Sequence, residues 1–286
     1  MNIIDGKKIA QELQAEIAHK ISLLTKRKPG LAFILIGNNP ASQTYVRAKK
    51  KACASTGILS TLLELPESTS QETLLAHIHE LNQNPHIDGI LIQLPLPLHI
   101  HDPIVMSAID PNKDVDGFHP LNVGKMLLGE ETGLLPCTPN GIKTLLQRHH
   151  IPISGKRVVI VGRSNIVGKP LAAILMQKKT NCNATVTIAH SGSEHLAEIT
   201  KSADILISAI GKPHFIQKEM VRKGAVVIDV GINRLPDHTL VGDVDFKNVA
   251  PIASWITPVP GGVGPMTIAM LLNNTLLSYQ RNRPLA

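Results

Sequence analysis

Aromatic side chains are scarce in this sequence of 286 residues, which contains one tryptophan, two tyrosines and four phenylalanines. Proteins that hold single-stranded nucleic acids stack the bases on aromatic rings, so the scarcity disfavours that function. Leucine, isoleucine and valine must fill the interior instead, as in α/β proteins whose parallel strands are buried on both faces. The chain is long enough for two domains of ordinary size.

Cysteine is equally scarce. Cys53, Cys137 and Cys182 lie far apart and show no Cys-x-x-Cys spacing. This excludes a disulfide framework and an ordinary zinc signature, and it suggests a reducing compartment. Asp114 and Asp116 offer two carboxylates, which are too few by themselves for a metal cage. The sequence therefore predicts no metal site.

No apolar run is long enough to cross a bilayer, and the first residues lack the apolar core of a signal peptide. We expect a soluble, cytoplasmic protein with no membrane partner. The formal net charge is +7, but lysine and arginine are dispersed along the chain. Phosphates or carboxylates on small molecules satisfy such a charge, so no nucleic-acid partner is expected.

Apolar strands alternate with helices in both halves of the chain. In the first half, helices from 40 to 57 and from 70 to 84 separate strands at 31–36, 59–65 and 89–92. In the second half, strands that suit a doubly wound parallel sheet are expected at 158–161, 184–188, 205–209 and 226–230. We predict two α/β domains flanking a cleft. Residues 1–139 and 266–286 form one, and residues 140–265 form a Rossmann-like domain.

The stretch from Gly162 to Pro170 is the most informative in the chain, because a glycine-bracketed turn directly follows a buried strand. Such a corner offers backbone N–H groups to a pyrophosphate. The pattern departs from the usual dinucleotide fingerprint, since Arg163 and Ser164 stand where Gly-x-Gly would continue. A plain strand-to-helix turn is the alternative. Arg163 can contact an anionic group, which favours NADP over NAD.

Tyr45 and Lys49 lie four residues apart and share one face of the helix expected from 40 to 57. That helix follows the carboxyl end of a strand, where open α/β sheets bind ligands. A half-buried tyrosine beside a snorkelling lysine is the structural alternative. Gln93 ends the strand at 89–92, where its amide can orient an ammonium or a water, or only cap strand carbonyls.

Asp116 lies in a loop where one carboxylate can accept paired N–H donors from an aminopyrimidine-like edge, and a solvated turn is the alternative. The segment 256–267 contains three glycines and three prolines before an apolar helix. Backbone must therefore form its surface, which favours close approach of a flat ligand over a plain crossing loop. The histidines form no arrangement typical of a catalytic triad.

Eight blocks of sequence occur in an order that resembles one family: 37–49, 88–97, 113–120, Pro136-Cys137-Thr138-Pro139, 162–170, 229–233, 242–246 and 257–267. Together they span nearly the whole chain and are similar to the bifunctional methylenetetrahydrofolate dehydrogenase/cyclohydrolase family. The resemblance implies a folate-binding cleft between two α/β domains, with NADP on the C-terminal one, and usually a homodimer.

The resemblance also assigns roles around the folate. It implies that Lys49 is the central catalytic residue, that Tyr45 stacks on the folate and that Gln93 supports the lysine. Asp116 would hold the pterin ring. Residues that line the substrate would be Cys137, Pro260, Gly261 and Gly264.

For the cofactor, the resemblance implies that the pyrophosphate contacts the turn formed by Gly162, Ser164, Ile166 and Gly168. Arg163 and Ser191 would lie near the adenosine ribose and its 2′-phosphate, and Ile232 near the nicotinamide. The chain departs from the family where Gly192-Ser193 replaces a frequent Lys-Thr. One cation near the phosphate is therefore missing, and Arg163 remains.

The implied activity belongs to one-carbon metabolism. The enzyme would oxidise 5,10-methylenetetrahydrofolate with NADP and then hydrolyse the methenyl bridge to 10-formyltetrahydrofolate. Two alternatives remain open: a dehydrogenase of the same family without cyclohydrolase activity, and a non-catalytic nucleotide-binding module.

Overall fold

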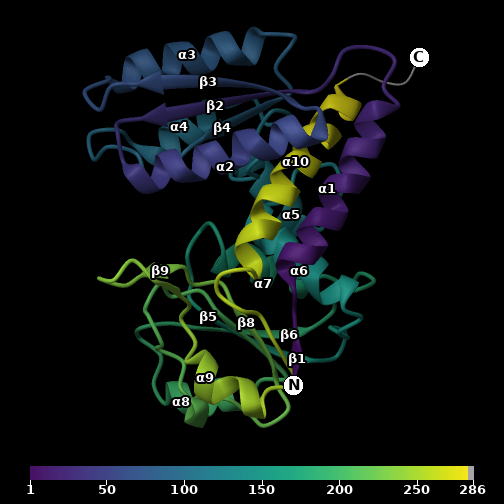
Figure 1. Cartoon of the computed structure of the whole chain (residues 1–286), viewed down its shortest axis with the longest axis vertical. Helices are drawn as coiled ribbons and strands as arrows, with labels where there is room; N and C mark the ends of the chain where they lie inside the picture. Colours follow the sequence, from purple (N-terminus) through teal and green to yellow (C-terminus); the bar gives the residue numbers. More distant parts are fainter. Residues whose placement is uncertain (283–286) are drawn as a thin grey trace. The chain divides into compact units, whose positions relative to one another are not determined.

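The computed structural model describes residues 1–282, and the contacts within the chain divide it into two compact units. Unit 1 contains Met1–Ala10 and Thr138–Thr267, and unit 2 contains Gln11–Cys137 and the chain from Ile268 onward. Each unit holds its own parallel sheet with helices, which confirms the predicted fold class. Figure 1 shows the chain coloured by position in the sequence, from purple at the N-terminus to yellow at the C-terminus.

Unit 2 is built on a three-stranded parallel sheet in the order β3-β2-β4. The strands are β2 (Gly30–Ile36), β3 (Leu59–Leu65) and β4 (Gly89–Ile92). Every residue of β2 and β4 is buried, as their continuous apolar runs predict, whereas the edge strand β3 is partly exposed. All three predicted strands are confirmed.

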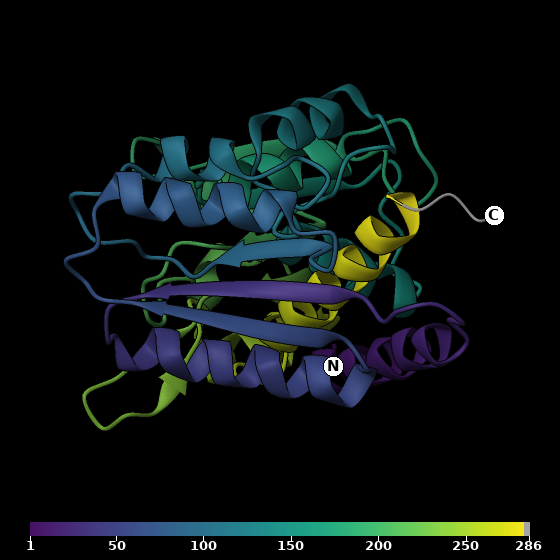
Figure 2. The same ribbon diagram turned by 90° about the horizontal axis from the view of Figure 1, so that it is seen from above.

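Two helices cover opposite faces of this sheet, as Figures 1 and 2 show: α2 (Pro40–Thr56) and α3 (Gln71–Gln83). The connections from β2 to β3 and from β3 to β4 run in opposite directions, and right-handed crossovers then place their helices on opposite sides. Asn39 caps the start of α2 by accepting the N–H groups of Ala41 and Ser42. Gly57 ends α2 with a φ of 82°, in the left-handed region.

The long irregular segment of unit 2 contains two short helices, α4 (Asp102–Ala108) and α5 (Pro120–Leu128). Helix α1 (Gly6–Ser22) begins in unit 1 and continues into unit 2, and α10 (Val263–Arg281) does the same. The Asn274 amide on α10 donates to the carbonyls of Val115 and Leu135, at 2.9 Å each. The last helix therefore packs on the first α/β unit, as predicted.

Unit 1 contains a six-stranded parallel sheet in the order β1-β11-β8-β7-β5-β6. Its strands are β1 (Asn2–Ile3), β5 (Arg157–Val161), β6 (Thr185–Ala189), β7 (Ile205–Ser208), β8 (Val226–Asp229) and β11 (Trp255–Ile256). The chain leaves β5 for β6 on one side and then crosses to β7 on the other. Doubly wound sheets bind ligands beyond the carboxyl ends of the strands at such a reversal.

The helices of unit 1 are α6 (Cys137–Arg148), α7 (Gly168–Leu175), α8 (Leu196–Lys201) and α9 (Phe246–Val249). Figure 1 shows α8 and α9 on one side of the sheet and α7 on the other. The remaining pieces are a two-stranded hairpin, β9 (Asn233–Arg234) with β10 (Leu240–Val241), and two 3-10 turns, η1 (Lys218–Met220) and η2 (Ala250–Ile252).

The first ten residues group with unit 1, whereas the sequence analysis placed them with the other α/β domain. The reason is that β1 pairs in parallel with β11, with Asn2 opposite Trp255 and Ile3 opposite Ile256. A two-residue strand carries no periodicity that sequence reasoning can detect.

Among the described residues, no helix combines the length and apolarity that a membrane span requires.

Candidate functional site

The Lys49 ammonium in unit 2 donates a hydrogen bond to Oε1 of Gln93, and the two atoms lie 3.1 Å apart. Lys49 comes from α2, and Gln93 directly follows β4. The other end of the amide, Nε2 of Gln93, donates to the Leu94 carbonyl at 2.7 Å. This second bond turns Oε1 toward the lysine. The structure therefore brings together the two residues that the sequence suggested separately.

Asp116 lies in the electrostatic field of Lys49. Burial raises the pKa of the Asp116 carboxyl above its ordinary value, and the positive charge of Lys49 opposes that shift. Burial, reinforced by the negative charge of Asp116, raises the pKa of the Cys137 thiol well above its ordinary value. A thiol that stays protonated is a poor nucleophile, so Cys137 suits a lining position.

Asp114 shapes the loop that carries Asp116. One oxygen of its buried carboxylate accepts the N–H groups of Gly117 and Phe118, at 3.1 Å each. The other accepts the N–H of His119 and the Asn122 amide, at 2.8 Å each. The turn also needs Gly117, which has a φ of 76° and no room for a Cβ beside the backbone of Leu135. This organising role for Asp114 was missed in the sequence.

Tyr45 lies one helical turn before Lys49 on α2, and 43% of its surface is exposed. An exposed aromatic ring can stack on a flat ligand. A position one turn from the lysine is what the four-residue spacing predicted.

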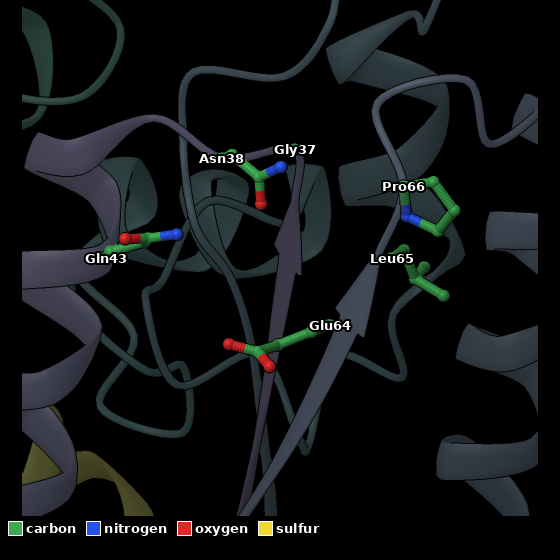
Figure 3. A pocket seen from close by; sticks show the side chains of 6 residues that line it. All are labelled: Gly37, Asn38, Gln43, Glu64, Leu65 and Pro66. Carbon is green, nitrogen blue, oxygen red and sulfur yellow. The ribbon is translucent and has the colours of Figure 1, made fainter.

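A separate pocket of about 280 Å³ lies at the carboxyl ends of β2 and β3. Figure 3 shows its lining, with the side chains of Asn38, Gln43 and Glu64. Lys49, Gln93 and Asp116 do not line it. Among the described residues that line the pocket, Glu64 alone is charged, so the pocket is unsuited to an anionic ligand.

In unit 1, the Gly162 turn stands at the point where the strand order reverses, between the carboxyl ends of β5 and β7. Gly162 has a φ of 124°, and a Cβ on it would overlap the Ala209 carbonyl that follows β7. A Cβ on Gly168 would overlap the Gly162 carbonyl. Both glycines thus keep side chains out of a narrow backbone corner, as close approach of a pyrophosphate requires.

Ser164 changes one detail of this corner. The sequence analysis expected unpaired N–H groups here, but Val167 and Gly168 donate theirs to the Ser164 hydroxyl, at 3.1 and 3.4 Å. Ser164 lies within the turn, and its hydroxyl pairs these two N–H groups at the start of α7, a role that glycine spacing alone does not reveal.

The other predicted cofactor residues present exposed side chains around the same edge of the sheet. Arg163 and Ile166 project from the turn after β5, Ser191 follows β6 and Ile232 follows β8. Because parallel strands end at a common edge, these residues from distant parts of the sequence lie along one side of unit 1.

Two buried aspartates underlie this edge, and the sequence analysis gave them no role. Asp229 ends β8, and Asp243 follows β10; their relative exposures are 3% and 0%. The Asp243 carboxylate accepts the N–H groups of Ile210, Gly211 and Lys212 in the loop after β7, at 2.7, 3.2 and 2.9 Å. The sequence signal that could have revealed these aspartates is a glycine close to each of them: Gly231 follows Asp229, and Gly242 precedes Asp243.

Pro260, Gly261 and Gly264 belong to unit 1. Pro260 and Gly261 lie on the loop between β11 and α10, and Gly264 lies in the first turn of α10. The Gly261 carbonyl accepts the Lys7 N–H at 2.9 Å, and Gly261 has a φ of 107°. Its backbone is therefore held by the N-terminal segment of the same unit.

No group of three or more metal-ligating side chains with suitable placement occurs within residues 1–282.

A doubly wound parallel sheet with a glycine turn at its reversal point is the architecture of dinucleotide-binding enzymes, and unit 1 has this architecture. Comparison with known proteins narrows the class. The model of the tetrahydrofolate dehydrogenase/cyclohydrolase catalytic domain matches residues 4–116, and that of the NAD(P)-binding domain of the same family matches residues 136–283. The chain belongs to the tetrahydrofolate dehydrogenase/cyclohydrolase family.

Individual relatives agree over the full length. The bifunctional protein FolD of Protochlamydia amoebophila is 56% identical over 289 residues, which cover 99% of each chain. The crystal structure of the bifunctional enzyme FolD from Campylobacter jejuni has 47% identity and a TM-score of 0.96, covering 99% of this chain and 100% of that one. A Trypanosoma brucei dehydrogenase-cyclohydrolase, solved with NADP and an inhibitor, has 40% identity and a TM-score of 0.93, covering 99% and 98%.

Proposed function

We propose that the chain oxidises 5,10-methylenetetrahydrofolate with NADP and then hydrolyses the methenyl product to 10-formyltetrahydrofolate. The Lys49–Gln93 hydrogen bond is the observation that carries the proposal, because it presents an oriented amine in a chain that matches both domains of the family. It favours the bifunctional enzyme over a dehydrogenase without cyclohydrolase activity and over a non-catalytic nucleotide-binding module.

The residues of unit 2 would hold the folate. Tyr45 offers an exposed ring for stacking, and Asp116 offers a carboxylate to the N–H edge of the pterin. Cys137 would line the same region as a protonated thiol, because burial raises its pKa. In unit 1, Pro260 and Gly261 of the loop before α10, and Gly264 in the first turn of α10, would contact the substrate mainly through backbone.

Unit 1 would hold the cofactor. The Gly162–Gly168 corner would hold the pyrophosphate, and the turn needs both glycines because a Cβ at either one would overlap backbone. Ser164 and Ile166 would contact the same part, Arg163 and Ser191 the ribose phosphate, and Ile232 the nicotinamide. When bound, NADP supplies the acceptor for the hydride that leaves the folate methylene carbon.

Lys49 would act as the general base of the hydrolysis. The methenyl bridge is cationic, so it disfavours a protonated Lys49 nearby and leaves the amine free to accept a proton. Water attacks the bridge carbon while Nζ of Lys49 takes one proton of that water, and the electron pair of the C=N bond moves to nitrogen. The C–N5 bond of this adduct then breaks. N5 receives the proton from Lys49, and the hydroxyl proton is released as the N10-formyl carbonyl forms. Gln93 keeps Nζ in place through Oε1. This step needs no group beyond the substrate, water and these side chains.

Two assays on the purified protein test the proposal. One follows NADPH formation from 5,10-methylenetetrahydrofolate, and the other follows methenyl hydrolysis without cofactor. Lys49→Met should reduce hydrolysis by at least about a hundredfold, the range expected for loss of a general base. Lys51→Met, two residues along the same helix with an exposed side chain, is the matched control and should retain both activities. Intact hydrolysis in Lys49→Met would refute the base role.

Cofactor choice is tested through Arg163. Removing an arginine that contacts a phosphate costs about 1.5–3 kcal/mol, so Arg163→Ala should raise the KM for NADP by about tenfold or more. The KM for NAD, which lacks the 2′-phosphate, serves as the control and should not change. Equal use of both cofactors by the unmodified enzyme would remove the proposed role of Arg163.

By family resemblance, the proposal also includes a homodimer located in the cytoplasm.

A further inference from the structure

Asp243 connects two loops at the carboxyl edge of the sheet in unit 1. Its Oδ2 accepts the N–H groups of Ile210 and Gly211, and its Oδ1 accepts the N–H of Lys212 at 2.9 Å. These three residues lie in the loop after β7, next to the point where the strand order of the sheet reverses. A single buried carboxylate thus determines the path of that loop.

The same carboxylate also holds the loop after β8. The Asn233 amide donates to Oδ1 of Asp243 at 3.0 Å. On the other side of Ile232, the Gly231 N–H donates to Oδ1 of Asp229, also at 3.0 Å. Both neighbours of Ile232 are therefore tied to buried carboxylates, while the Ile232 side chain stays 45% exposed.

Asp229 and Asp243 are joined to each other through backbone. Asp229 accepts the N–H groups of Asp243 and Val244, at 2.9 Å each. A Cβ on Gly231 would overlap the Asp243 carboxylate, and a Cβ on Gly242 would overlap the Asp229 carboxylate. The two glycines leave the space that the carboxylates occupy, so the loops and the aspartates form one closely packed arrangement.

We propose that Asp243 is a positioning residue for the nicotinamide, because it sets the Ile232 loop and the 210–212 loop in a fixed relation. The inference rests on the proposed function, which places the nicotinamide near Ile232. Asp243 itself is fully buried and does not need to touch the cofactor. Hydride transfer requires the donor and acceptor carbons in a near-attack geometry, and a displacement of about 1 Å can reduce the rate by about a hundredfold.

A charged group is required at this position because all its backbone and amide partners are donors. A carboxylate offers acceptors on both oxygens, whereas an asparagine would turn an NH₂ group toward N–H groups. Asp243→Asn should therefore separate the two loops, and Asn233→Ala should release only the Ile232 loop.

Asn233→Ala is the central variant, and Asn248→Ala is its matched control. Asn248 also donates its amide to an aspartate of unit 1, Asp245, at 2.6 Å, but it lies on α9. We expect Asn233→Ala to lower kcat for the oxidation by about tenfold or more and to increase the primary deuterium isotope effect. Asn248→Ala should keep both values.

Two further measurements separate positioning from general damage. Binding of 2′,5′-ADP, a probe for the adenosine end of the cofactor site alone, should be unchanged in Asn233→Ala. Methenyl hydrolysis measured without cofactor should also be unchanged. In Asp243→Asn, the loss of oxidation should be greater than in Asn233→Ala, since both loops are affected.

The outcomes distinguish the inference from the function on which it rests. If Asn233→Ala and Asn248→Ala oxidise the substrate equally well, the positioning role is overturned while the proposed function stands. Loss of 2′,5′-ADP binding in parallel with kcat would also overturn it, because the defect would then be structural. No NADP-dependent oxidation by the unmodified enzyme would overturn the proposed function and this inference with it.

Discussion

Asp229 shows how burial can change the charge of a side chain. Burial raises its pKa to about 7, although the N–H groups of Val244, Asp243 and Gly231 favour the ionised form. The nearby carboxylate of Asp243 adds to the upward shift. Asp229 therefore changes charge near neutral pH, which an aspartate in water does not.

This shift makes the stability of unit 1 depend on pH. The folded protein binds the Asp229 proton more tightly than the unfolded chain, so the stabilisation is complete below about pH 4 and is lost as the pH rises to about 7. Between about pH 5 and about pH 7, the contribution of one such group to the free energy of unfolding falls by about 2 kcal/mol. In Asp229→Asn this component should be absent.

Urea unfolding of both proteins across this pH range provides the measurement. Trp255 is the only tryptophan in the chain and lies in unit 1, so its fluorescence follows the unfolding of that unit. Parallel pH profiles for the two proteins would show that Asp229 does not titrate in this range.

Single residues of the site were only partly predictable. The face shared by Tyr45 and Lys49 follows from helical spacing, and Gln93 was identified from its place at the end of a strand. The link between Lys49 and Gln93 spans 44 residues and depends on how α2 packs on the sheet. Asp243 was missed because its partners lie at positions 210–212 and 233, and no local pattern connects them.

The glycine turn is the element on which cofactor binding depends. Gly168 begins α7, and a Cβ there would overlap the Gly162 carbonyl, so Gly168→Ala must displace the turn. We expect the Kd for NADP to rise by at least about tenfold, an effect of about 1.4 kcal/mol. Titration calorimetry with NADP measures it.

Gly124→Ala is the matched control for this substitution. Gly124 also lies in a helix, α5, and a Cβ on it would meet nothing within 4 Å. Alanine there should stabilise the protein by up to about 1 kcal/mol through its helix propensity. If Gly168→Ala binds NADP as tightly as Gly124→Ala does, the close-approach role of the turn is wrong.

Elements with long apolar runs were predicted well. The bounds of β3 and β4 agree with the sequence prediction, β5, β7 and β8 differ from it by one residue at one end, and β6 is shifted by one residue at both ends. The high Val, Ile and Leu content of β4, β5, β7 and β8 is typical of strands buried on both faces. The two-residue strands β1, β9, β10 and β11 were not predicted, because they exist only through their pairing partners.

At the scale of the whole chain, each unit is discontinuous in sequence, and the last helix contributes to unit 2. Arg27 forms a two-pronged ion pair with Asp88, with both N–O distances at 2.6 Å. Its guanidinium also lies 5.1 Å from the centre of the Tyr279 ring on α10. The Tyr279 hydroxyl donates to the Arg27 carbonyl at 2.8 Å. These contacts join three distant parts of the chain.

Arg27→Ala would leave the buried Asp88 carboxylate without its cation. Removing one partner of such a pair costs about 3–5 kcal/mol, and we expect the free energy of unfolding to fall by that amount. Arg47→Ala, at an exposed arginine on α2, should change it by less than about 0.5 kcal/mol. Urea unfolding followed by circular dichroism measures both. Equal stability of the two variants would contradict the structural role of the pair.

The sequence by itself determined the strands, the glycine turn and the shared face of Tyr45 and Lys49. Each of these depends on residues that are close along the chain, where backbone geometry dictates spacing. Only the tertiary structure decided which side chains meet across long separations, such as Lys49 with Gln93 and Asp243 with two loops. It also decided the pKa of Asp229, because burial is produced by the packing of distant segments and not by local spacing.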